Sequence, residues 1–257
     1  GPLSTIVPRR YAVKAAPERQ LRLLDLQAID TRLSQIAHAR SHLPELAEIA
    51  DLQHKAGLLD DQLVRARTEV DDIAREMDRA DADVQQVRER AARDRARLDA
   101  GTGTSKELTA IQHELESLAR RQSDLEDVEL EVMERSEAAQ SDVRELERGR
   151  AELGERITAL EASRDDRLKD LAFEETGVSG PRAGLLGEIG DELVGLYDKI
   201  RATSGIGAAA LTRRRCGGCQ LELNQIELNR IAAAPADEVL RCEECRRILV
   251  RTPESGL

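Results

Sequence analysis

The chain has almost no aromatic residues and no long apolar run. Only 1% of its 257 residues are aromatic: one Phe, two Tyr and no Trp. Because a sizeable globular core normally buries more aromatic surface than this, most of the chain is not an ordinary globular domain. Spans of about 18 apolar residues are absent, and no apolar segment lies near the N-terminus, which argues against a membrane helix or a signal peptide. We therefore expect a soluble, non-secreted, cytoplasmic protein without a membrane partner.

Charged residues are abundant instead. They make up 35% of the chain, and the formal net charge is −11. Such a composition, combined with helical periodicity, is typical of long helices or a coiled coil. The acidic balance disfavours general coating of nucleic acid. Residues 205–251 differ, because their formal charge is +2, but a centre of four thiolates and one Zn²⁺ would bring this segment close to neutrality. Charge therefore gives nucleic-acid binding only weak support.

Apolar residues recur at alternating spacings of three and four along much of the chain, which predicts helices. The first helix is expected to start near Pro17, since the first helical turn tolerates proline. Pro44 interrupts the pattern, so we expect a break near residues 41–45. The next eleven positions of the pattern are all apolar, which predicts one strand of a coiled coil. These positions, called the seam below, are Ala56, Leu59, Leu63, Ala66, Val70, Ile73, Met77, Ala80, Val84, Val87 and Ala91.

The chain is predicted to reverse its direction at residues 100–105. Gly101 and Gly103 supply the backbone freedom that a turn needs, and Thr104 with Glu107 matches a capping box at the start of the next helix. A phosphate-binding loop is rejected here, because its glycine spacing is not matched and no strand precedes the turn. The returning helix is expected to keep the seam pattern, with polar residues intruding at Gln122, Glu129, Ser136, Arg150 and Arg164.

The fold class that these patterns predict is mainly α: a long antiparallel coiled-coil hairpin followed by a small C-terminal β zinc ribbon. Two such arms joined by a short turn pair within one chain by default, and the hairpin would be on the order of 80–100 Å long. The chain is expected to be a monomer or a coiled-coil dimer. The expected segments are a tag or disordered sequence at 1–14, the hairpin at 15–175 with its tip near 100–105, a linker and docking helix at 176–204, the ribbon at 205–251, and a tail at 252–257.

All four cysteines lie in two C-x-x-C pairs separated by 22 residues. Each pair points two thiolates at one centre, and two pairs complete the tetrahedron that Zn²⁺ prefers. We predict one structural zinc ion bound by Cys216, Cys219, Cys242 and Cys245. Short strands beside each pair, with a helix capped by Asn224 between them, complete the predicted ribbon.

Two disulfides or two redox pairs are the alternatives to zinc. A thioredoxin-type C-x-x-C sits in a βαβ pattern, and neither pair here does. A zinc–thiolate redox switch is a further hypothesis, and it requires zinc release on mild oxidation. Reduced thiols bound to zinc are typical of the cytoplasm.

Patterns that would indicate catalysis are missing from the sequence. Four thiolates close a zinc site and leave no position for a catalytic water. No Ser/His/Asp set, catalytic carboxylate pair or nucleotide fingerprint stands out, and solvated helix faces explain the many carboxylates. We therefore predict a protein that is not an enzyme. The histidines lie on the predicted helices, away from the cysteines, at His38, His42, His54 and His113.

Five arginines flank the two cysteine pairs. Because the pairs converge at the metal, we expect the five guanidinium groups near one another, as a contact patch for RNA, DNA or an acidic protein surface. The alternative is that they solubilise strand edges and offset the charge of the metal centre. No aromatic residue of the ribbon is available for base stacking, which favours a protein partner. The arginines are Arg213, Arg214, Arg215, Arg246 and Arg247.

Motifs at both ends of the predicted hairpin resemble the bacterial C4-type zinc ribbon family, in which a long helical hairpin precedes a C-terminal ribbon. The resemblance covers residues 15–251. The family's usual Gly after the last cysteine is Arg246 here, and its usual prolines after the first pair are replaced near Leu223-Asn224; neither change removes a metal ligand. The motifs are Ser105-Lys106-Glu107-Leu108 and Ile111-Gln112-His113-Glu114 at the tip, and Cys216-Gly217-Gly218-Cys219 and residues 237–249 in the ribbon.

This resemblance implies a non-enzymatic adaptor. The family includes a flagellar chaperone for an alternative sigma factor that also contacts flagellin messenger RNA, and a chlamydial relative with similar partners. We therefore expect a protein partner that binds through the zinc ribbon and through the hairpin tip at Lys106 and Glu107. Binding of RNA or DNA through the arginine-flanked ribbon is the alternative.

Overall fold

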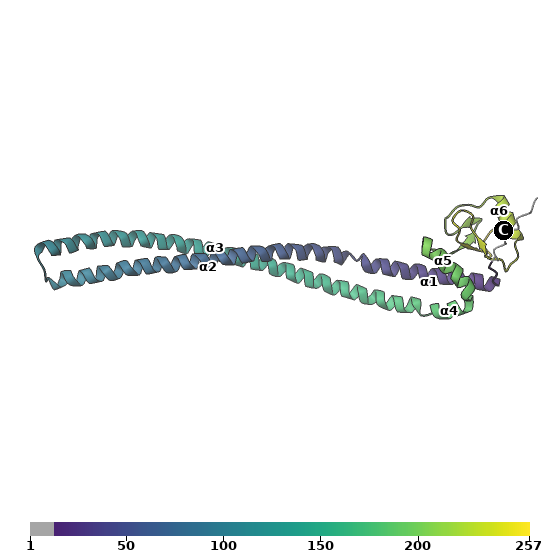
Figure 1. The fold of residues 1–257 in the computed structure, drawn as a ribbon, viewed down its shortest axis with the longest axis horizontal. Helices are drawn as coiled ribbons and strands as arrows, with labels where there is room; N and C mark the ends of the chain where they lie inside the picture. The colour runs from purple at the N-terminus through teal and green to yellow at the C-terminus, as the bar shows by residue number, and fades with distance from the viewer. Residues whose placement is uncertain (1–12) are drawn as a thin grey trace, which may run out of the picture. The chain divides into compact units, whose positions relative to one another are not determined.

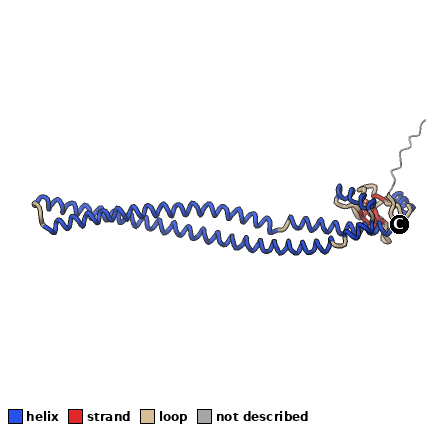
Figure 2. The backbone as a smooth tube through the Cα atoms, turned by 60° about the horizontal axis from the view of Figure 1, so that its bottom comes forward, coloured by secondary structure: helices blue, strands red, loops and turns tan. Residues whose placement is uncertain are grey.

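The structure is a computed structural model that describes residues 13–257 (Figure 1). Most of the segment predicted to be a tag, residues 1–12, lies outside the described residues. The described chain divides into two compact units. One unit is residues 44–163, and the other combines the residues before 44 with residues 164–257. Within the described part, helices dominate and the strands gather near the C-terminal end (Figure 2). None of the described helices is long and apolar enough to cross a membrane.

The unit of residues 44–163 is an antiparallel pair of helices, which confirms the predicted hairpin. α2 (Pro44–Ala100) and α3 (Ser105–Ser179) run side by side (Figure 1). α3 continues past residue 175, the predicted end of the hairpin, and stops just before Gly180-Pro181, where proline cannot donate a helical hydrogen bond. Buried seam residues that the pattern predicted are Ala56, Leu63, Ile73, Ala80 and Val84 on α2, and Ile111, Leu125, Val132, Ala139 and Leu160 on α3.

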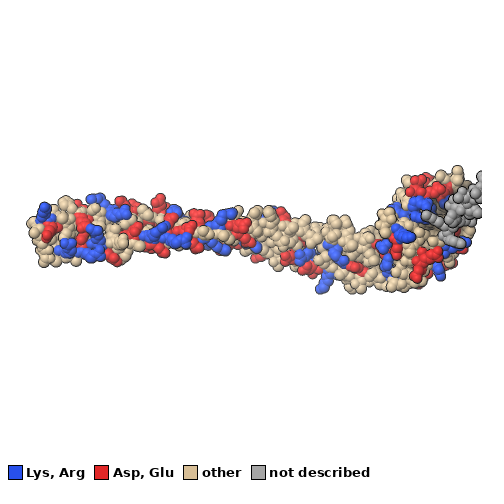
Figure 3. All heavy atoms as spheres, viewed as in Figure 1, with Lys and Arg blue, Asp and Glu red and all other residues tan. Residues whose placement is uncertain are grey.

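Charged side chains are frequent on the outside of this hairpin. Basic and acidic residues are interspersed along its surface (Figure 3). Exposed ion pairs of this kind contribute little stability each, so the apolar seam carries most of the pairing energy and the charges help to set which turns face each other. Pairs that join the two helices are Arg67–Glu147, Arg88–Glu126, Arg135–Glu76 and Arg150–Asp60.

The turn between the two helices has the predicted capping box. The backbone N–H of Glu107 donates to the Thr104 hydroxyl at 3.2 Å, and the N–H of Thr104 donates to the Glu107 carboxylate at 3.0 Å. These bonds satisfy N–H groups that have no helical partner. The local sequence therefore fixes the position at which α3 begins.

The second unit begins with α1 (Pro17–Ser41), and the predicted break follows it before Pro44. The buried face of α1 includes Leu23, Leu26 and Ile36, but also the polar residues Gln27 and Asp30. Buried polar groups need hydrogen-bond partners, so this face is built for specific contacts as well as for apolar packing.

Two helices, rather than the single docking helix predicted, follow α3. α4 (Arg182–Ile189) and α5 (Asp191–Ser204) meet at Gly190, whose φ is 94°. This backbone conformation favours glycine. The apolar spacing is continuous through the break, which is why the pattern alone predicted one helix.

Four short strands form one sheet in the order β2-β1-β4-β3. β1 pairs with β4 in parallel, and the other two pairs are antiparallel. α6 (Gln225–Ala233) is capped as predicted, because the Asn224 side chain accepts the Glu227 N–H at 2.8 Å. The strands are β1 (Ala208–Thr212), β2 (Arg215–Cys216), β3 (Leu240–Arg241) and β4 (Ile248–Val250).

This sheet is buried on both faces, since successive residues of a strand point to opposite sides. Ala208, Ile248 and Val250 pack against α1, α4 and α5 in a core that includes Tyr197. Ala209, Leu211 and Leu249 pack on the other side with α6 and the buried cysteines. The ribbon is therefore one layer of a larger unit, and its sheet is held by helices as well as by the cysteine turns.

Residues beyond the predicted ribbon boundaries also join the sheet region. Lys14 forms a bridge with Glu238, and the Val239 N–H donates to the Val13 carbonyl at 3.3 Å. Ser255, in the segment predicted to be a tail, is buried and donates its hydroxyl to the Leu211 carbonyl at 2.8 Å. The folded unit therefore includes residues 13–14, before the predicted hairpin, and Ser255, after the predicted ribbon.

A buried carboxylate ties α1 to α4 and α5. Asp30 is 3% exposed, and it accepts hydrogen bonds from Arg182 Nε at 2.8 Å and from the Tyr197 hydroxyl at 2.7 Å. Burial alone raises the pKa of Asp30, but the hydrogen bonds from Arg182 and Tyr197 outweigh it and hold this pKa below its ordinary value. The charged form of Asp30 is therefore part of the folded state.

Replacing Asp30 with Ala should destabilise this unit by about 3–5 kcal/mol, because Arg182 and Tyr197 lose a buried acceptor. Urea unfolding followed by tyrosine fluorescence measures the loss. Since the folded-state pKa of Asp30 is depressed, its contribution is full above the pKa of the unfolded chain and disappears as pH falls through the folded value. Asp25→Ala, at an exposed position, is the control and should cost less than about 1 kcal/mol. If the difference in unfolding free energy between the parent and Asp30→Ala stays the same at acidic pH, this explanation is contradicted.

Candidate metal centre

Two similar turns carry the cysteines. Cys216 ends β2, and Cys242 follows β3. In each turn, the N–H of the residue after the second cysteine donates to the carbonyl of the first cysteine: Gln220 to Cys216 at 2.8 Å, and Arg246 to Cys242 at 2.9 Å. The two C-x-x-C segments therefore present their thiols with the same local geometry.

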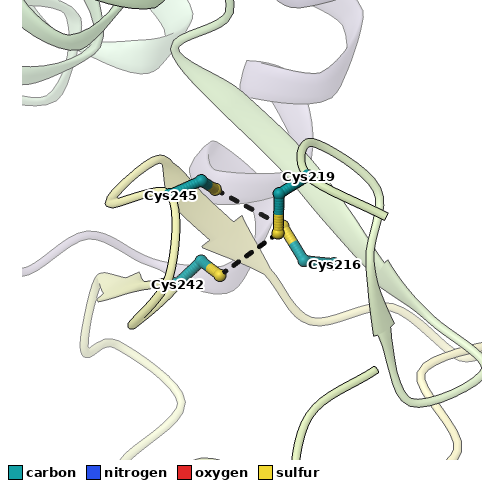
Figure 4. Close-up of side chains that lie close together, drawn as sticks. All are labelled: Cys216, Cys219, Cys242 and Cys245. Atoms are coloured by element: carbon teal, nitrogen blue, oxygen red, sulfur yellow. Dashed lines mark hydrogen bonds between the residues drawn. The ribbon is translucent and has the colours of Figure 1, made fainter. Parts of the chain in front are cut away.

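The four thiols point toward one centre (Figure 4). The sulfur atoms of Cys216 and Cys245 are 3.8 Å apart, as are those of Cys219 and Cys242, and all four lie within 4.8 Å of one another. Disulfide sulfurs are about 2.05 Å apart, so these cysteines are free thiols. Four sulfurs at about 2.3 Å from a tetrahedral Zn²⁺ are about 3.8 Å from each other. The arrangement fits a structural zinc ion.

The electrostatics of the cluster favour a bound cation. Burial, together with charge on Cys242 and Cys245, raises the pKa of the Cys216 thiol to about 12. Burial also raises the pKa of Cys242. Converging thiolates in a partly buried site repel one another, and a divalent cation offsets this repulsion. Zinc binding is therefore expected to supply folding energy to the ribbon.

The residue after each cysteine pair has a left-handed backbone. The φ of Gln220 is 65° and that of Arg246 is 63°. This conformation is costly for residues with a side chain and favours glycine. The glycine expected after the last cysteine from the resemblance thus has a physical reason, and Arg246 adopts the same conformation at some cost.

The five predicted contact arginines fall into two groups, which are held by different hydrogen bonds and ion pairs. Arg213 and Arg214 form the β1–β2 turn, where their N–H groups donate to the Glu254 and Ser255 carbonyls at 2.8 Å. Arg215 lies 3.7 Å from the Glu222 carboxylate. Arg246 and Arg247 follow the second cysteine pair, and Arg247 Nε donates to the Ser204 hydroxyl at 3.4 Å. No hydrogen bond among the described residues joins the two groups, so a single patch of five guanidinium groups stays a prediction.

Lys106 and Glu107 lie in the first turn of α3, and both are exposed. Glu107 is held by the capping box, whereas Lys106 has no ion-pair partner among the described residues. The tip and the metal centre belong to different compact units. The two places predicted for partner contact therefore belong to different units, and contact at either one stays a prediction.

Sequence reasoning did not single out the polar residues that fasten the ribbon to α1. The Gln27 side-chain carbonyl accepts the N–H of Gly207 at 2.8 Å, and Gln20 Nε2 donates to the Ala15 and Ala236 carbonyls at 2.9 and 3.2 Å. Arg251 Nη1 donates to the Ala234 carbonyl at the end of α6, at 2.8 Å. Gln20 and Gln27 lie on the same face as Leu23, and this interruption of an apolar face is the signal that would have identified them.

The fold and the cysteine geometry together define the class: a coiled-coil hairpin protein with a C4 zinc ribbon. Residues 26–205 match the CT398-like coiled coil hairpin domain, and residues 215–249 match the C4-type zinc ribbon domain. The chain therefore belongs to the CT398-like coiled-coil hairpin family.

Similar proteins occur in mycobacteria. An uncharacterized protein of Mycobacterium tuberculosis is 37% identical over 239 residues, which cover 93% of this chain and 98% of that protein. An uncharacterized protein of Mycobacterium leprae is 30% identical, covering 90% of this chain and 95% of the relative. A solved structure from Mycobacterium smegmatis has 38% identity and a TM-score of 0.82, covering 93% of this chain and all of that one. CT398 from Chlamydia trachomatis, at 16% identity, has a TM-score of 0.65 over 91% of this chain and 98% of its own, and shows a common fold.

Replacing Cys242 with Ser removes one of the four ligands. We expect zinc content to fall from about one ion per chain to well below half, and the ribbon to unfold locally, because Cys242 belongs to the core beneath α6. The hairpin of residues 44–163 should keep its helix content. Elemental analysis and circular dichroism measure the two effects. Ser123→Ala, on the exposed face of α3, is the control; a Cys242→Ser protein with full zinc would contradict the assignment.

Replacing Arg246 with Gly should raise the stability of the zinc-loaded protein by about 1 kcal/mol, because glycine adopts a positive φ without strain. Arg247→Gly is the matched control. Arg247 does not have a positive φ, so its replacement should lower stability through added freedom of the unfolded chain. Thermal unfolding compares the two variants, and an Arg246→Gly protein less stable than the parent would refute the strain argument.

Proposed function

We propose that this protein is a non-enzymatic adaptor, which binds a protein partner through its zinc ribbon and through the tip of its hairpin. The observation that carries the proposal is the cluster of four cysteine sulfurs within 4.8 Å. A zinc ion with four protein ligands has no open position for water or substrate. Such a zinc ion stabilises the fold of the ribbon and has no catalytic role.

The packing of the ribbon supports a role in presenting a surface. Its sheet is covered on one face by α1, α4 and α5 and on the other by α6. Gln27 and the bridge at Lys14 add hydrogen bonds that fix the ribbon in its unit. A rigid binding surface loses little conformational entropy when it meets a partner.

The exposed residues of the ribbon suit a protein partner. Ile226 on α6 is 83% exposed and Leu221 is 51% exposed. Arg213, Arg214 and Arg246 are also exposed and have no carboxylate partner among the described residues. Apolar side chains beside arginines are typical of protein interfaces. This combination favours a protein with an acidic and partly apolar surface.

A zinc site of four thiolates suits the cytoplasm, where reducing conditions keep the thiols from forming disulfides.

Nucleic-acid binding is the second candidate function. The specific observation in its favour is that four of the five flanking arginines lack a carboxylate partner among the described residues, with Arg215 as the exception. Guanidinium groups bind phosphate through paired hydrogen bonds.

Affinity purification from a mycobacterial lysate tests the adaptor function. The parent protein is compared with a ribbon variant, in which Arg213, Arg214, Arg246 and Arg247 are replaced by Ala, and with a tip variant, Lys106→Ala/Glu107→Ala. We expect a protein partner that survives nuclease treatment and is lost from at least one variant. If both variants retain every partner, the proposed contacts are wrong.

A salt titration of binding to mixed RNA and DNA separates the second function from the first. Binding through arginine–phosphate contacts weakens steeply as salt rises, because counterions are released. The adaptor function predicts no binding at low salt by the zinc-loaded protein. Salt-sensitive binding that disappears when Arg213, Arg214 and Arg215 are replaced by Ala would favour nucleic acid instead.

A further inference from the structure

The seam of the hairpin contains a buried carboxylate close to the tip. Continued from Ala91, the alternating spacing of three and four residues leads to Asp94 and then to Leu98. Asp94 is 6% exposed, and its Oδ2 atom is buried without a hydrogen-bond partner among the described residues. A charged group is thus placed where the pattern requires an apolar one.

The ion pair nearest to Asp94 involves another carboxylate. Arg90, one turn earlier on α2, pairs with Glu114 on α3. Because the helices are antiparallel, Asp94 lies nearer to the tip than this pair, in the part of the seam to which Ile111, which is 8% exposed, also belongs. Arg90 is already engaged by Glu114, so the basic residue one turn before Asp94 on α2 is committed to another carboxylate.

The other buried carboxylates in the described chain all have partners. Asp30 accepts from Arg182 and Tyr197, Glu45 accepts from the Ser163 hydroxyl at 3.1 Å, and Glu227 pairs with Arg230. Asp94 differs from all three. A buried carboxylate without partners destabilises the contact that buries it.

We propose that Asp94 marks a protein-binding site at the hairpin tip, where residues 87–115 separate and a helix of the partner places a Lys or Arg side chain against this carboxylate. The closed seam leaves Asp94 Oδ2 without a hydrogen-bond partner, which lowers the cost of opening at this turn. This inference rests on the proposed adaptor function, because it names the chemistry of the partner at the tip.

The neighbouring residues indicate the rest of the partner's chemistry. Ala91 and Leu98 flank Asp94 on the seam of α2, and Ile111 is a buried seam residue of α3 near the tip. Once exposed, they would form an apolar strip interrupted by one negative charge. The complementary surface is the apolar face of an amphipathic helix with one basic residue among its apolar positions. Phosphate groups would be repelled by Asp94, so a nucleic acid does not suit this site.

Hydrogen exchange of the full-length, zinc-loaded protein tests the first part of the proposal. Asp94→Leu should slow amide exchange in residues 87–115 by at least about tenfold, because an unpartnered buried charge is replaced by an apolar side chain. Gln122→Leu is the matched control: Gln122 is also a polar seam residue, but its side chain donates to Glu126 at 2.9 Å. That variant should leave exchange near the tip unchanged. Unaltered or faster exchange at the tip of Asp94→Leu would overturn the proposal.

Binding of synthetic helices tests the second part. Two amphipathic peptides of about three heptads share a leucine stripe and differ at one central position of the stripe, which is Arg in one and Glu in the other. The parent protein should bind the Arg peptide at least about tenfold more tightly, and Asp94→Asn should remove this preference. Equal binding, no binding of either peptide, or a preference that persists in Asp94→Asn would overturn the proposal.

These tests can fail separately from the adaptor function. They use only the tip, whereas the affinity purification also reports the ribbon. If exchange at the tip is unaltered in Asp94→Leu, or both peptides bind equally, while a partner is lost from the ribbon variant, the adaptor function stands and the site at Asp94 does not.

Discussion

Four sulfur atoms held within 4.8 Å of one another are the constraint on which the ribbon depends. Converging thiolates are unfavourable until a divalent cation neutralises them, so the ribbon acquires its folding energy from metal as well as from burial. The second source is the sheet itself, which the helices cover on both faces. The turns that carry the cysteines, together with α6, stabilise one face of the sheet, and α1, α4 and α5 pack against the other. This double support makes the ribbon a rigid surface, which suits an adaptor.

Most of the architecture could be predicted from the sequence because its determinants are local. The eleven apolar seam positions predicted the hairpin, Thr104 with Glu107 predicted the start of α3, and four cysteines in two pairs predicted the metal ligands. These patterns work because each depends on residues a few positions apart. The scarcity of aromatic residues pointed in the same direction, since a hairpin of two helices needs only a narrow apolar seam.

Features that depend on distant residues could not be predicted. The parallel pairing of β1 with β4, the docking of Gln27 on Gly207, and the Asp30 cluster all join segments far apart in the sequence. Gly190 breaks an apolar pattern that is otherwise continuous, and only its backbone conformation reveals the two helices. Asp94 sits at a seam position, but the structure was needed to show that its Oδ2 atom is buried without a hydrogen-bond partner. At each of these places the structure depends on contacts between segments that are far apart in the sequence or on a backbone conformation, and patterns of neighbouring residues report neither.

The central claim is that the metal site is closed and structural. X-ray absorption at the zinc edge of the purified protein tests it most directly, because it reports the number and kind of ligand atoms. The account predicts four sulfur neighbours at about 2.3 Å and no oxygen or nitrogen in the first coordination shell. A zinc ion with fewer sulfurs and a bound water would contradict it, since an open position would make the site suited to catalysis.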